Sequence, residues 1–235
     1  MKPIAIFRHS PTEGPGYFAT YLNARGLPWQ LVKLDEGEGV PAGVGTFSGL
    51  VFMGGPMSVN DDLPWIAPVL DLIRKAVPAD VPVLGHCLGG QLMSKALGGS
   101  VGRNPVKEIG WGEIEVADNP EAKAWFGPDL KRFESFHWHG ETFTIPPGAV
   151  RIMGNRNCEN QGFVAGKNLG MQCHVEMTED LVEIWCKSGS DEIATAISPA
   201  VQTPGQMQRG MEQKLGALGV VADRLYHRWV EGLRH

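Results

Sequence analysis

One cysteine stands in a sequence context that suits covalent catalysis. Cys87 lies in the segment GHCLGGQ, residues 85–91, between an apolar run that predicts a strand and a stretch that predicts a helix. The Gly-x-Cys-x-Gly pattern is typical of a nucleophile elbow, a strained turn in which side chains at positions 85 and 89 would collide. The helix N-terminus favours negative charge on the sulfur, and the backbone N–H of Leu88 could hold an oxyanion. The alternative is a structural cysteine in a glycine-rich turn.

His174 and Glu176 could supply a base and the carboxylate that orients it. They follow an apolar strand predicted over residues 169–173, and their spacing of two sends both side chains to the same side. The carboxylate can accept a hydrogen bond from one imidazole nitrogen and leave the other nitrogen facing a thiol. Cys87 also follows a predicted strand, and the carboxyl ends of parallel strands meet at one edge of a sheet.

His137 and His139 compete with His174 for the role of base. They form an H-x-H pair near the end of a predicted strand, and such a pair could instead bind zinc. The sequence offers no third ligand at a suitable spacing. We therefore expect no metal and no other cofactor.

The elements that must position these residues alternate along the first part of the chain. Apolar runs bounded by turn residues predict buried strands, and amphipathic stretches predict helices that end near glycine. The predicted strands cover residues 3–7, 29–33, 49–53 and 81–85, and the predicted helices cover 16–25, 64–77 and 87–97. This alternation predicts an α/β fold with three αβα layers and a mostly parallel, flavodoxin-like central sheet.

The second part of the chain follows a different pattern. Between about residues 100 and 175 the sequence predicts strands with little helix between them, at 109–116, 149–153, 161–165 and 169–173. These strands should extend the sheet and form a small antiparallel patch. A helix is expected over 178–187 and a long amphipathic helix over 206–233. We expect a domain over residues 1–198 and a helical extension, residues 199–235, packed on the same domain.

Composition and charge narrow the classes of function. The chain has 235 residues, of which 43% are hydrophobic, and its net charge is −5, which argues against a nucleic-acid partner. It contains no run of 18 apolar residues and no signal-peptide core, so we expect no membrane partner. Its four cysteines lie far apart without a C-x-x-C pair, which indicates a reducing compartment and a cytoplasmic protein.

Several segments together resemble the class I, or triad-type, glutamine amidotransferase family. The elbow GHCLGGQ is followed downstream by His-x-Glu within MQCHVE, residues 171–176. The segment GGPMS, residues 54–58, resembles the G-G-P-x-S segment of the family. Residues 137–141, HWHGE, resemble its S-H-G-D turn. The resemblance runs from residue 1 to about 187 and is nearest to the stand-alone, GMP-synthetase-like branch.

The resemblance implies a role for each matching residue. Cys87, His174 and Glu176 would form the catalytic triad, and the N–H groups of Gly55 and Leu88 the oxyanion hole. The substrate would be held by the residues that match the elbow glutamine and the turn, namely Gln91, Trp138, His139 and Gly140. The chain departs from the family pattern at Val175, which replaces proline, at Trp138, which replaces serine, and at His86, which could tune the thiol or simply pack.

The implied activity is hydrolysis of the side-chain amide of glutamine through a cysteine thioester. The sequence contains no phosphate-binding G-x-x-x-x-G-K-[ST] loop, so a synthetase that uses the ammonia would have to be a partner in trans. Hydrolysis of γ-glutamyl conjugates by a peptidase with the same triad is one alternative. A catalytically silent binding or regulatory module is another. The final helix should pack on its own domain, or contact a second copy in a homodimer or a synthetase.

Overall fold

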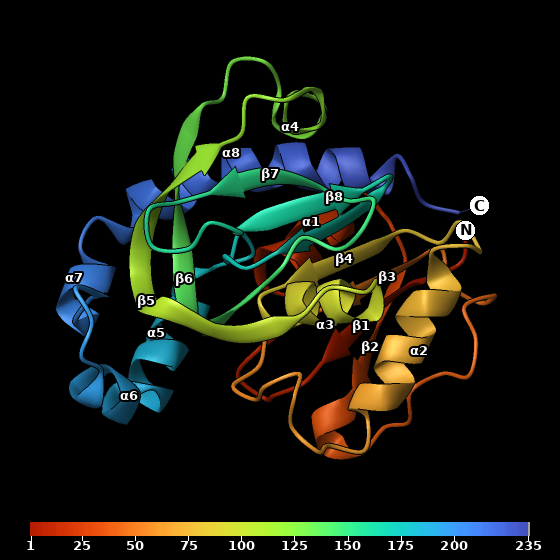
Figure 1. Ribbon diagram of the computed structural model, residues 1–235, viewed down its shortest axis with the longest axis horizontal. Coiled ribbons are helices and arrows are strands. Elements are labelled where there is room, and N and C mark those ends of the chain that lie inside the picture. The colour runs from red at the N-terminus through yellow and green to blue at the C-terminus, as the bar shows by residue number, and fades with distance from the viewer. Residues whose placement is uncertain (235) are drawn as a thin grey trace.

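The first strand shows how the sequence builds a sheet that is covered on both faces. The computed structural model describes residues 1–234 and begins with β1 (Ile4–Arg8). Ile4 and Ile6 pack into one hydrophobic cluster, whereas Ala5 and Phe7 pack into a second cluster on the opposite face. Because successive side chains of a strand point to opposite faces, an apolar run without polar positions must be buried on both. The three layers follow from this pattern (Figure 1).

Five parallel strands form the centre of the sheet. Their order is β9-β4-β3-β1-β2, and each neighbouring pair is parallel. The remaining four of these strands are β2 (Trp29–Lys33), β3 (Gly49–Phe52), β4 (Val83–His86) and β9 (Asn168–Met171). The carboxyl ends of β3, β4 and β9 therefore lie side by side at one edge of the sheet.

An antiparallel patch continues the sheet beyond β9. It contains β5 (Val101–Val116), β6 (Arg132–Phe143), β7 (Val150–Gly154) and β8 (Gly162–Ala165), and the short β10 (Ala200–Val201) pairs in parallel with β5. The long β5–β6 hairpin curves away from the parallel strands (Figure 1). The predicted fold class, mostly parallel with an antiparallel patch, is confirmed.

Helices cover both faces of the sheet. The helices α2 (Ile66–Ala76) and α3 (Leu88–Ala96) contribute to the cluster that contains Phe7. The cluster that contains Ile4 is built with α1 (Gly16–Ala24), α4 (Pro120–Phe126), α5 (Glu179–Ser188), α7 (Pro204–Gln208) and α8 (Met211–Val230). A short α6 (Ser190–Thr195) and a 3-10 turn, η1 (Leu34–Glu36), complete the elements. No helix among residues 1–234 is long and apolar enough to cross a membrane.

The structure corrects three details of the predicted elements. Residues 137–141 lie inside β6 and not in a turn. The helix α4 lies in a region where little helix was expected; Asn119 caps it and Pro120 begins it. The helix predicted over 206–233 is two helices, because Gly210 between them has a φ of 66°.

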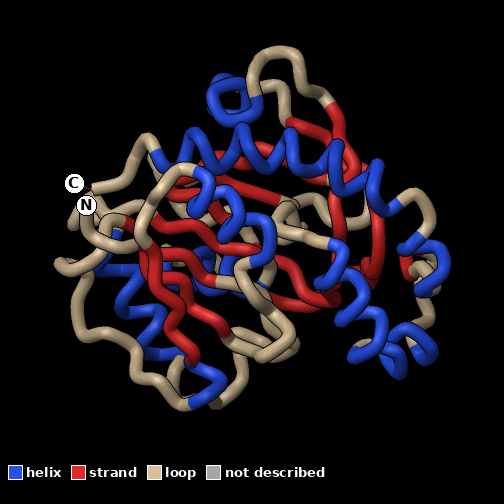
Figure 2. Tube along the Cα trace, turned by 180° about the vertical axis from the view of Figure 1, so that it is seen from behind, coloured by secondary structure: helices blue, strands red, loops and turns tan. Residues whose placement is uncertain are grey.

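The C-terminal helix α8 is part of the hydrophobic core. Figure 2 shows it as the long helix that runs across one face of the sheet. Trp229 and Tyr226 are fully buried, and a methyl group built on Gly49 of β3 would lie 2.7 Å from the Trp229 ring. The expected extension 199–235 ends in His235, which lies outside the described residues.

Candidate functional site

Cys87 sits on a sharp turn between β4 and α3. Its φ of 48° and ψ of −107° are unusual for a residue with a side chain and mark local strain. A methyl group built on Gly85 would lie 2.4 Å from the carbonyl carbon of Gly89, and one built on Gly89 would lie 2.0 Å from the carbonyl oxygen of Phe52. The turn thus requires glycine at both positions, for the steric reason that the sequence suggested.

His174 and Glu176 meet directly after the end of β9. Nδ1 of His174 donates to Oε1 of Glu176 at 2.6 Å, and both side chains are buried. The backbone N–H of His174 donates to the carbonyl oxygen of Phe136 at 2.8 Å, which ties the segment to β6. The edge of Trp185 packs against the imidazole ring at 4.7 Å between centroids. The imidazole is therefore held in one orientation.

Electrostatics favour an imidazolium at His174. Burial alone would lower the pKa of His174, but the carboxylate of Glu176 and the sulfur of Cys87 raise it well above the ordinary value. Burial would likewise raise the pKa of Glu176, but the neighbouring His86 and His174 lower it to about 2. His174 and Glu176 thus form an ion pair, and the imidazole of this pair faces Cys87.

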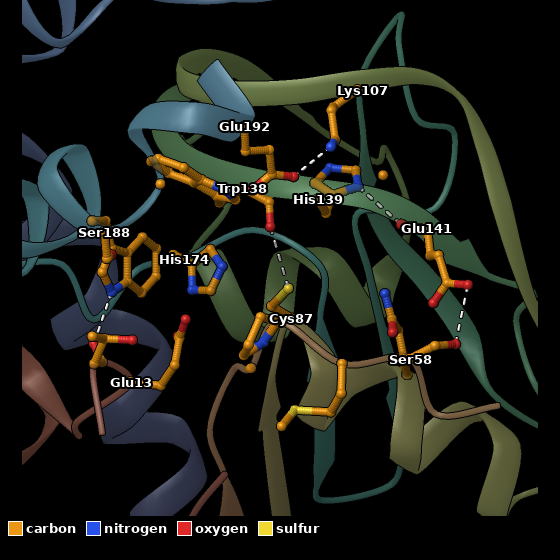
Figure 3. Close-up of a pocket in the computed structure, with 18 residues that line it drawn as sticks. Glu13, Ser58, Cys87, Lys107, Trp138, His139, Glu141, His174, Ser188 and Glu192 are labelled. Atoms are coloured by element: carbon orange, nitrogen blue, oxygen red, sulfur yellow. Dashed lines mark hydrogen bonds and ion pairs between the residues drawn. The ribbon is translucent and has the colours of Figure 1, made fainter. Parts of the chain in front are cut away.

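The sulfur of Cys87 is close to two further polar groups. It lies 3.4 Å from Nε2 of Gln172 and 3.7 Å from the carbonyl oxygen of Trp138. Nε2 of His174 has no hydrogen-bond partner among residues 1–234 and belongs to the ring that faces Cys87 in Figure 3. The unpaired nitrogen is thus available to exchange a proton with a reacting group.

A second layer behind Glu176 connects the site to the C-terminal helix. His86 precedes Cys87 but does not point at the pocket: its Nε2 lies 3.7 Å from Oε2 of Glu176 and 3.2 Å from the hydroxyl of Tyr226. Burial lowers the pKa of His86, while the charge of Glu176 acts in the opposite direction. The contact of Tyr226 with His86 was not predicted, because 140 residues separate the two in the chain.

The two expected oxyanion donors are neighbours. Gly55 lines the pocket, Leu88 is the first residue of α3, and a methyl group built on Gly55 would lie 2.9 Å from Cδ2 of Leu88. His9, which the sequence reading missed, supports the Gly55 segment: its Nδ1 donates to the carbonyl oxygen of Met53 at 3.0 Å. Burial lowers the pKa of His9 to about 4, so its ring is neutral.

The expected substrate-binding residues line the same pocket as Cys87. Gln91 lines the pocket, and its Nε2 donates to Oε1 of Gln172 at 3.1 Å. Trp138, His139 and Gly140 follow one another along β6 and also line the pocket. The structure brings all nine expected site residues to one region around the elbow, with Leu88 and Glu176 just behind the wall.

Neither competing base candidate presents a free nitrogen to Cys87. Nε2 of His139 lies 3.0 Å from Oε2 of Glu108 and its Nδ1 lies 2.9 Å from the carbonyl oxygen of Glu141, so both nitrogens are engaged. His137 lines a separate cavity with Glu108. His174 is the histidine whose ring faces Cys87 with a free nitrogen (Figure 3).

The expectation that no third metal ligand accompanies the H-x-H pair was wrong. Glu108 joins His137 and His139, and their ligand atoms lie within 4.8 Å of one another. The Glu108 carboxylate, however, already accepts hydrogen bonds from four side chains: His139, Asn155, Asn157 and Gln161. Burial would raise the pKa of Glu108, but the hydrogen bond from His139, the charges of His137 and His139 and the hydrogen bond from Asn157 lower it to about 2. The carboxylate of Glu108 thus has hydrogen-bond donors in place of a cation, whereas neither ring nitrogen of His137 has a hydrogen-bond partner among residues 1–234.

The pocket contains residues that sequence analysis did not identify. Its volume is about 390 Å³, and α5 and α6 contribute Trp185, Ser188 and Glu192 to its wall. The Glu192 carboxylate forms an ion pair with Lys107 and accepts a hydrogen bond from Nε1 of Trp138 at 2.8 Å. These contacts connect α6 to β5 and β6 at the rim of the pocket. Glu13, from the loop after β1, also lines the pocket. No motif marked these residues, because they are spread over several elements.

Comparisons with known proteins place this arrangement in a family. The sequence model of the family described as glutamine amidotransferase class-I matches residues 18–182. The glutamine amidotransferase-like protein YfeJ of Salmonella typhimurium is 30% identical over 197 residues, which cover 80% of this chain and 81% of that protein. A glutamine-hydrolysing GMP synthase subunit of Sulfolobus acidocaldarius is 33% identical over 144 residues, covering 59% of this chain and 73% of that relative.

Solved structures of glutamine amidotransferases are similar to this chain over nearly its whole length. The crystal structure of a glutamine amidotransferase from Methylobacillus flagellatus superimposes with a TM-score of 0.97 at 42% identity, covering 100% of this chain and 96% of that one. The crystal structure of the Thermotoga maritima glutamine amidotransferase tm1158 gives a TM-score of 0.87 at 28% identity and covers 98% of both chains. The similarity to both structures extends through the C-terminal helices.

Proposed function

Because this chain belongs to the class I glutamine amidotransferase family, we propose that it hydrolyses the side-chain amide of glutamine to glutamate and ammonia. The observation that carries the proposal is the placement of Cys87, on a strained elbow, opposite an imidazole that Glu176 orients at 2.6 Å. A nucleophile, a base and an orienting acid in this order form the minimal machinery of acyl transfer.

The reaction would proceed through a thioester. The Cys87 thiolate attacks the γ-carbonyl carbon of glutamine, and the N–H groups of Gly55 and Leu88 stabilise the oxyanion, at roughly 3 kcal/mol for each donor. His174, as imidazolium, gives its proton to the departing nitrogen, and the C–N bond breaks. The neutral His174 then takes a proton from water, which attacks the thioester and releases glutamate. Glu176 keeps the ring oriented throughout.

The amino-acid end of glutamine would bind on the side of the pocket formed by β6. Trp138, His139 and Gly140 of β6 line the pocket together with Gln91 of α3, and Ser58 donates a hydrogen bond of 3.1 Å to Glu141 of β6. The buried network of His139 with Glu108 holds this part of β6 from behind. We assign these residues to substrate binding on that basis.

The ammonia would be used by a synthetase that binds this chain in trans, in the cytoplasm. Relatives in Sulfolobus acidocaldarius and Sulfurisphaera tokodaii are each named as one subunit of a glutamine-hydrolysing GMP synthase, and such a name implies a second chain. The four cysteines are all unpaired, which fits a reducing compartment. These names support a partner of this kind without identifying it.

Replacement of Cys87 tests the proposal directly. Cys87→Ser should lower ammonia release from glutamine at least about 1,000-fold, because the hydroxyl is a far weaker nucleophile in this setting. Cys158→Ser is the matched control, since burial raises the pKa of the Cys158 thiol to about 11 and the residue lies away from the pocket.

Labelling gives an independent measurement. A glutamine-like alkylating agent should modify Cys87 and leave the other three cysteines unmodified, as read by peptide mass spectrometry. Burial raises the pKa of Cys173 to about 12 and also raises that of Cys186, so both thiols should be inert. Labelling of Cys158, Cys173 or Cys186 with Cys87 unmodified, or full activity of Cys87→Ser, would contradict the assignment.

A further inference from the structure

The pocket has two ends on either side of Cys87. Ser58 and Glu141 lie on one side in Figure 3, and Glu13, His174 and Ser188 lie on the other. The first end, with Ser58 and Glu141, is the one assigned above to the amino-acid part of glutamine, whereas the indole of Trp138 packs against Trp185 nearer the second end. This inference rests on the proposed function. In that reaction His174 gives its proton to the nitrogen of the scissile amide, so the leaving group departs at the second end, where His174 lies.

Glu13 places a carboxyl group at this second end. A methyl group built on Gly54 would lie 2.6 Å from Oε2 of Glu13 and 3.1 Å from Cε1 of His174, so the carboxyl group and the imidazole flank the same point of the backbone. Glu13 lines the pocket, and Figure 3 shows its side chain directed toward His174. The acid is thus close to the group that delivers the proton.

The carboxyl group of Glu13 has no protein partner. Among residues 1–234 it forms no hydrogen bond or ion pair, and no dashed line reaches it in Figure 3. The other two carboxylates of the pocket do have partners, because Glu192 pairs with Lys107 and Glu141 accepts from Ser58. Burial raises the pKa of Glu13 to about 7, while the charge of His174 lowers it and that of Glu176 raises it. Glu13 is partly buried in the pocket wall, so a group that enters the pocket can reach a carboxyl group that no protein group occupies.

The loop that carries Glu13 is held in place. Nε1 of Trp185 donates to the carbonyl oxygen of Thr12 at 2.8 Å, and the backbone N–H of Glu13 donates to the carbonyl oxygen of Ser10 at 3.0 Å. Trp185 is the same residue that packs against His174. The backbone that carries Glu13 is therefore held beside His174 by the fold.

The charge at this end selects between kinds of leaving group. Lys107 is the one lysine or arginine that lines the pocket in the described chain, and Glu192 neutralises it. A leaving amine that carries an ammonium group would pair with Glu13. A leaving amino acid or peptide would bring its own carboxylate toward an acid that has no cation beside it other than His174, and like charges at this distance repel.

We propose that Glu13 is a specificity-determining residue that binds a cationic group on the leaving side of the scissile bond. The substrates that it favours, besides glutamine, are γ-glutamyl amides of diamines, in which the second nitrogen stays charged. The chemistry is unchanged: the sulfur forms the thioester, the C–N bond breaks, and the diamine leaves with the proton from His174. γ-Glutamyl amino acids are disfavoured.

The test compares three amides of the γ-carboxyl group of glutamate with glutamine itself. The amines are 1,4-diaminobutane, its neutral isostere n-pentylamine, and glycine, and the readout is kcat/KM from glutamate release. The wild-type chain should prefer the diaminobutane amide over the n-pentyl amide by roughly tenfold to a hundredfold, the range of a charge-assisted hydrogen bond. The glycine amide should be the poorest of the four substrates.

Variants then assign the preference to Glu13. Glu13→Gln should bring the ratio of the two amine substrates to near one, Glu13→Asp should retain part of it, and Asp191→Asn, an exposed charge next to the pocket rim, should leave it unchanged. Equal kcat/KM values for the two amides in the wild-type chain, or turnover of glutamine alone, would overturn the inference but not the proposed function. Failure to hydrolyse glutamine and all three amides would overturn the proposed function. If Glu13→Gln does not fold, the ratio of kcat/KM for the diaminobutane amide to that for the n-pentyl amide in the wild-type chain tests the inference.

Discussion

At the scale of single residues, the site depends on one buried ion pair. His174 and Glu176 are both removed from solvent, and their short contact of 2.6 Å joins opposite charges. Burial is unfavourable for each charge alone, so each residue needs the other to stay ionised. The same pairing that orients the imidazole for catalysis therefore also contributes to the stability of the fold, and this contribution depends on pH.

Glu176→Gln should lower the free energy of unfolding most strongly between about pH 4.5 and 6.5. The folded-state pKa of Glu176, about 2, lies below its ordinary value of 4.5, so its contribution is present above pH 4.5 and is lost as the pH falls toward 2. The pKa of His174 is raised above 6.5, so its contribution is present below pH 6.5 and is lost as the pH rises through the raised value.

Urea unfolding of both proteins at about pH 3, 5.5 and 9 measures this dependence. Loss of one partner of a buried pair costs on the order of 3 to 5 kcal/mol, so the difference at the middle pH should be of this size and should shrink at either side. Glu159→Gln, which removes an exposed partner of Arg151, is the control and should show no such maximum. A difference that does not vary with pH would contradict the ion pair.

At the scale of elements, the C-terminal helix α8 takes part in positioning the site. Tyr226 of α8 contacts His86 at 3.2 Å, and Nε2 of His86 lies 3.7 Å from Oε2 of Glu176, an oxygen that has no hydrogen-bond partner among residues 1–234. The chain of contacts runs from α8 through the residue before the elbow to the carboxylate behind His174. The helix lies beyond residues 18–182, the part matched by the family.

Tyr226→Phe should therefore lower kcat several-fold and leave KM close to its wild-type value. The hydroxyl of Tyr226 holds the ring of His86, and without this contact the ring no longer supports the carboxylate of Glu176. The residues that line the pocket are unchanged, so substrate binding should be retained. Tyr17→Phe is the matched control: it removes a hydroxyl that donates to Asp223 of α8 at 2.9 Å but does not reach His86. Both variants should lose about 1 kcal/mol of stability. Equal kcat losses in the two would show that the effect is only structural.

At the scale of the whole molecule, the sheet and α8 share one hydrophobic core. Leu218, Leu225 and Trp229 of α8 pack with strand residues of β1 and β9 in one cluster. Since a helix that buries its apolar face against a sheet cannot leave without exposing both surfaces, the helix and the central strands should open together.

Hydrogen–deuterium exchange tests this expectation. Peptides that cover residues 211–230 and 83–86 should report the same free energy of opening, equal to that of global unfolding, whereas α6, which has no buried residue, should exchange at much lower cost. The α6 peptide is thus an internal control for local opening. Faster exchange over 211–230 than over 83–86 would show that α8 detaches as a separate unit.

The parts of the fold that sequence reasoning recovered are those with a regular hydrophobic period. The strands of the parallel centre and the helices α1 to α3 were predicted within a few residues, because the strands are short apolar runs bounded by turn residues and the helices have apolar positions that repeat with the period of a helix. The strand β6 was missed because its buried side carries Ser135, His137 and His139 in place of apolar residues. The two histidines lie beside Glu108, and the hydroxyl of Ser135 donates to the carbonyl oxygen of His174, contacts that no local pattern reveals.

The sequence by itself determined the elbow and the pairing of His174 with Glu176. Residues within a few positions of each other are confined by backbone geometry, so two glycines around a cysteine and a histidine two residues from a glutamate restrict the outcome strongly. Only the tertiary structure decided that Tyr226 stands behind the site, that Glu108 joins the H-x-H pair, and that Glu13 enters the pocket without a partner. These contacts join distant segments, and their formation depends on the order of strands in the sheet and on the packing of helices over it, which no short stretch of residues encodes.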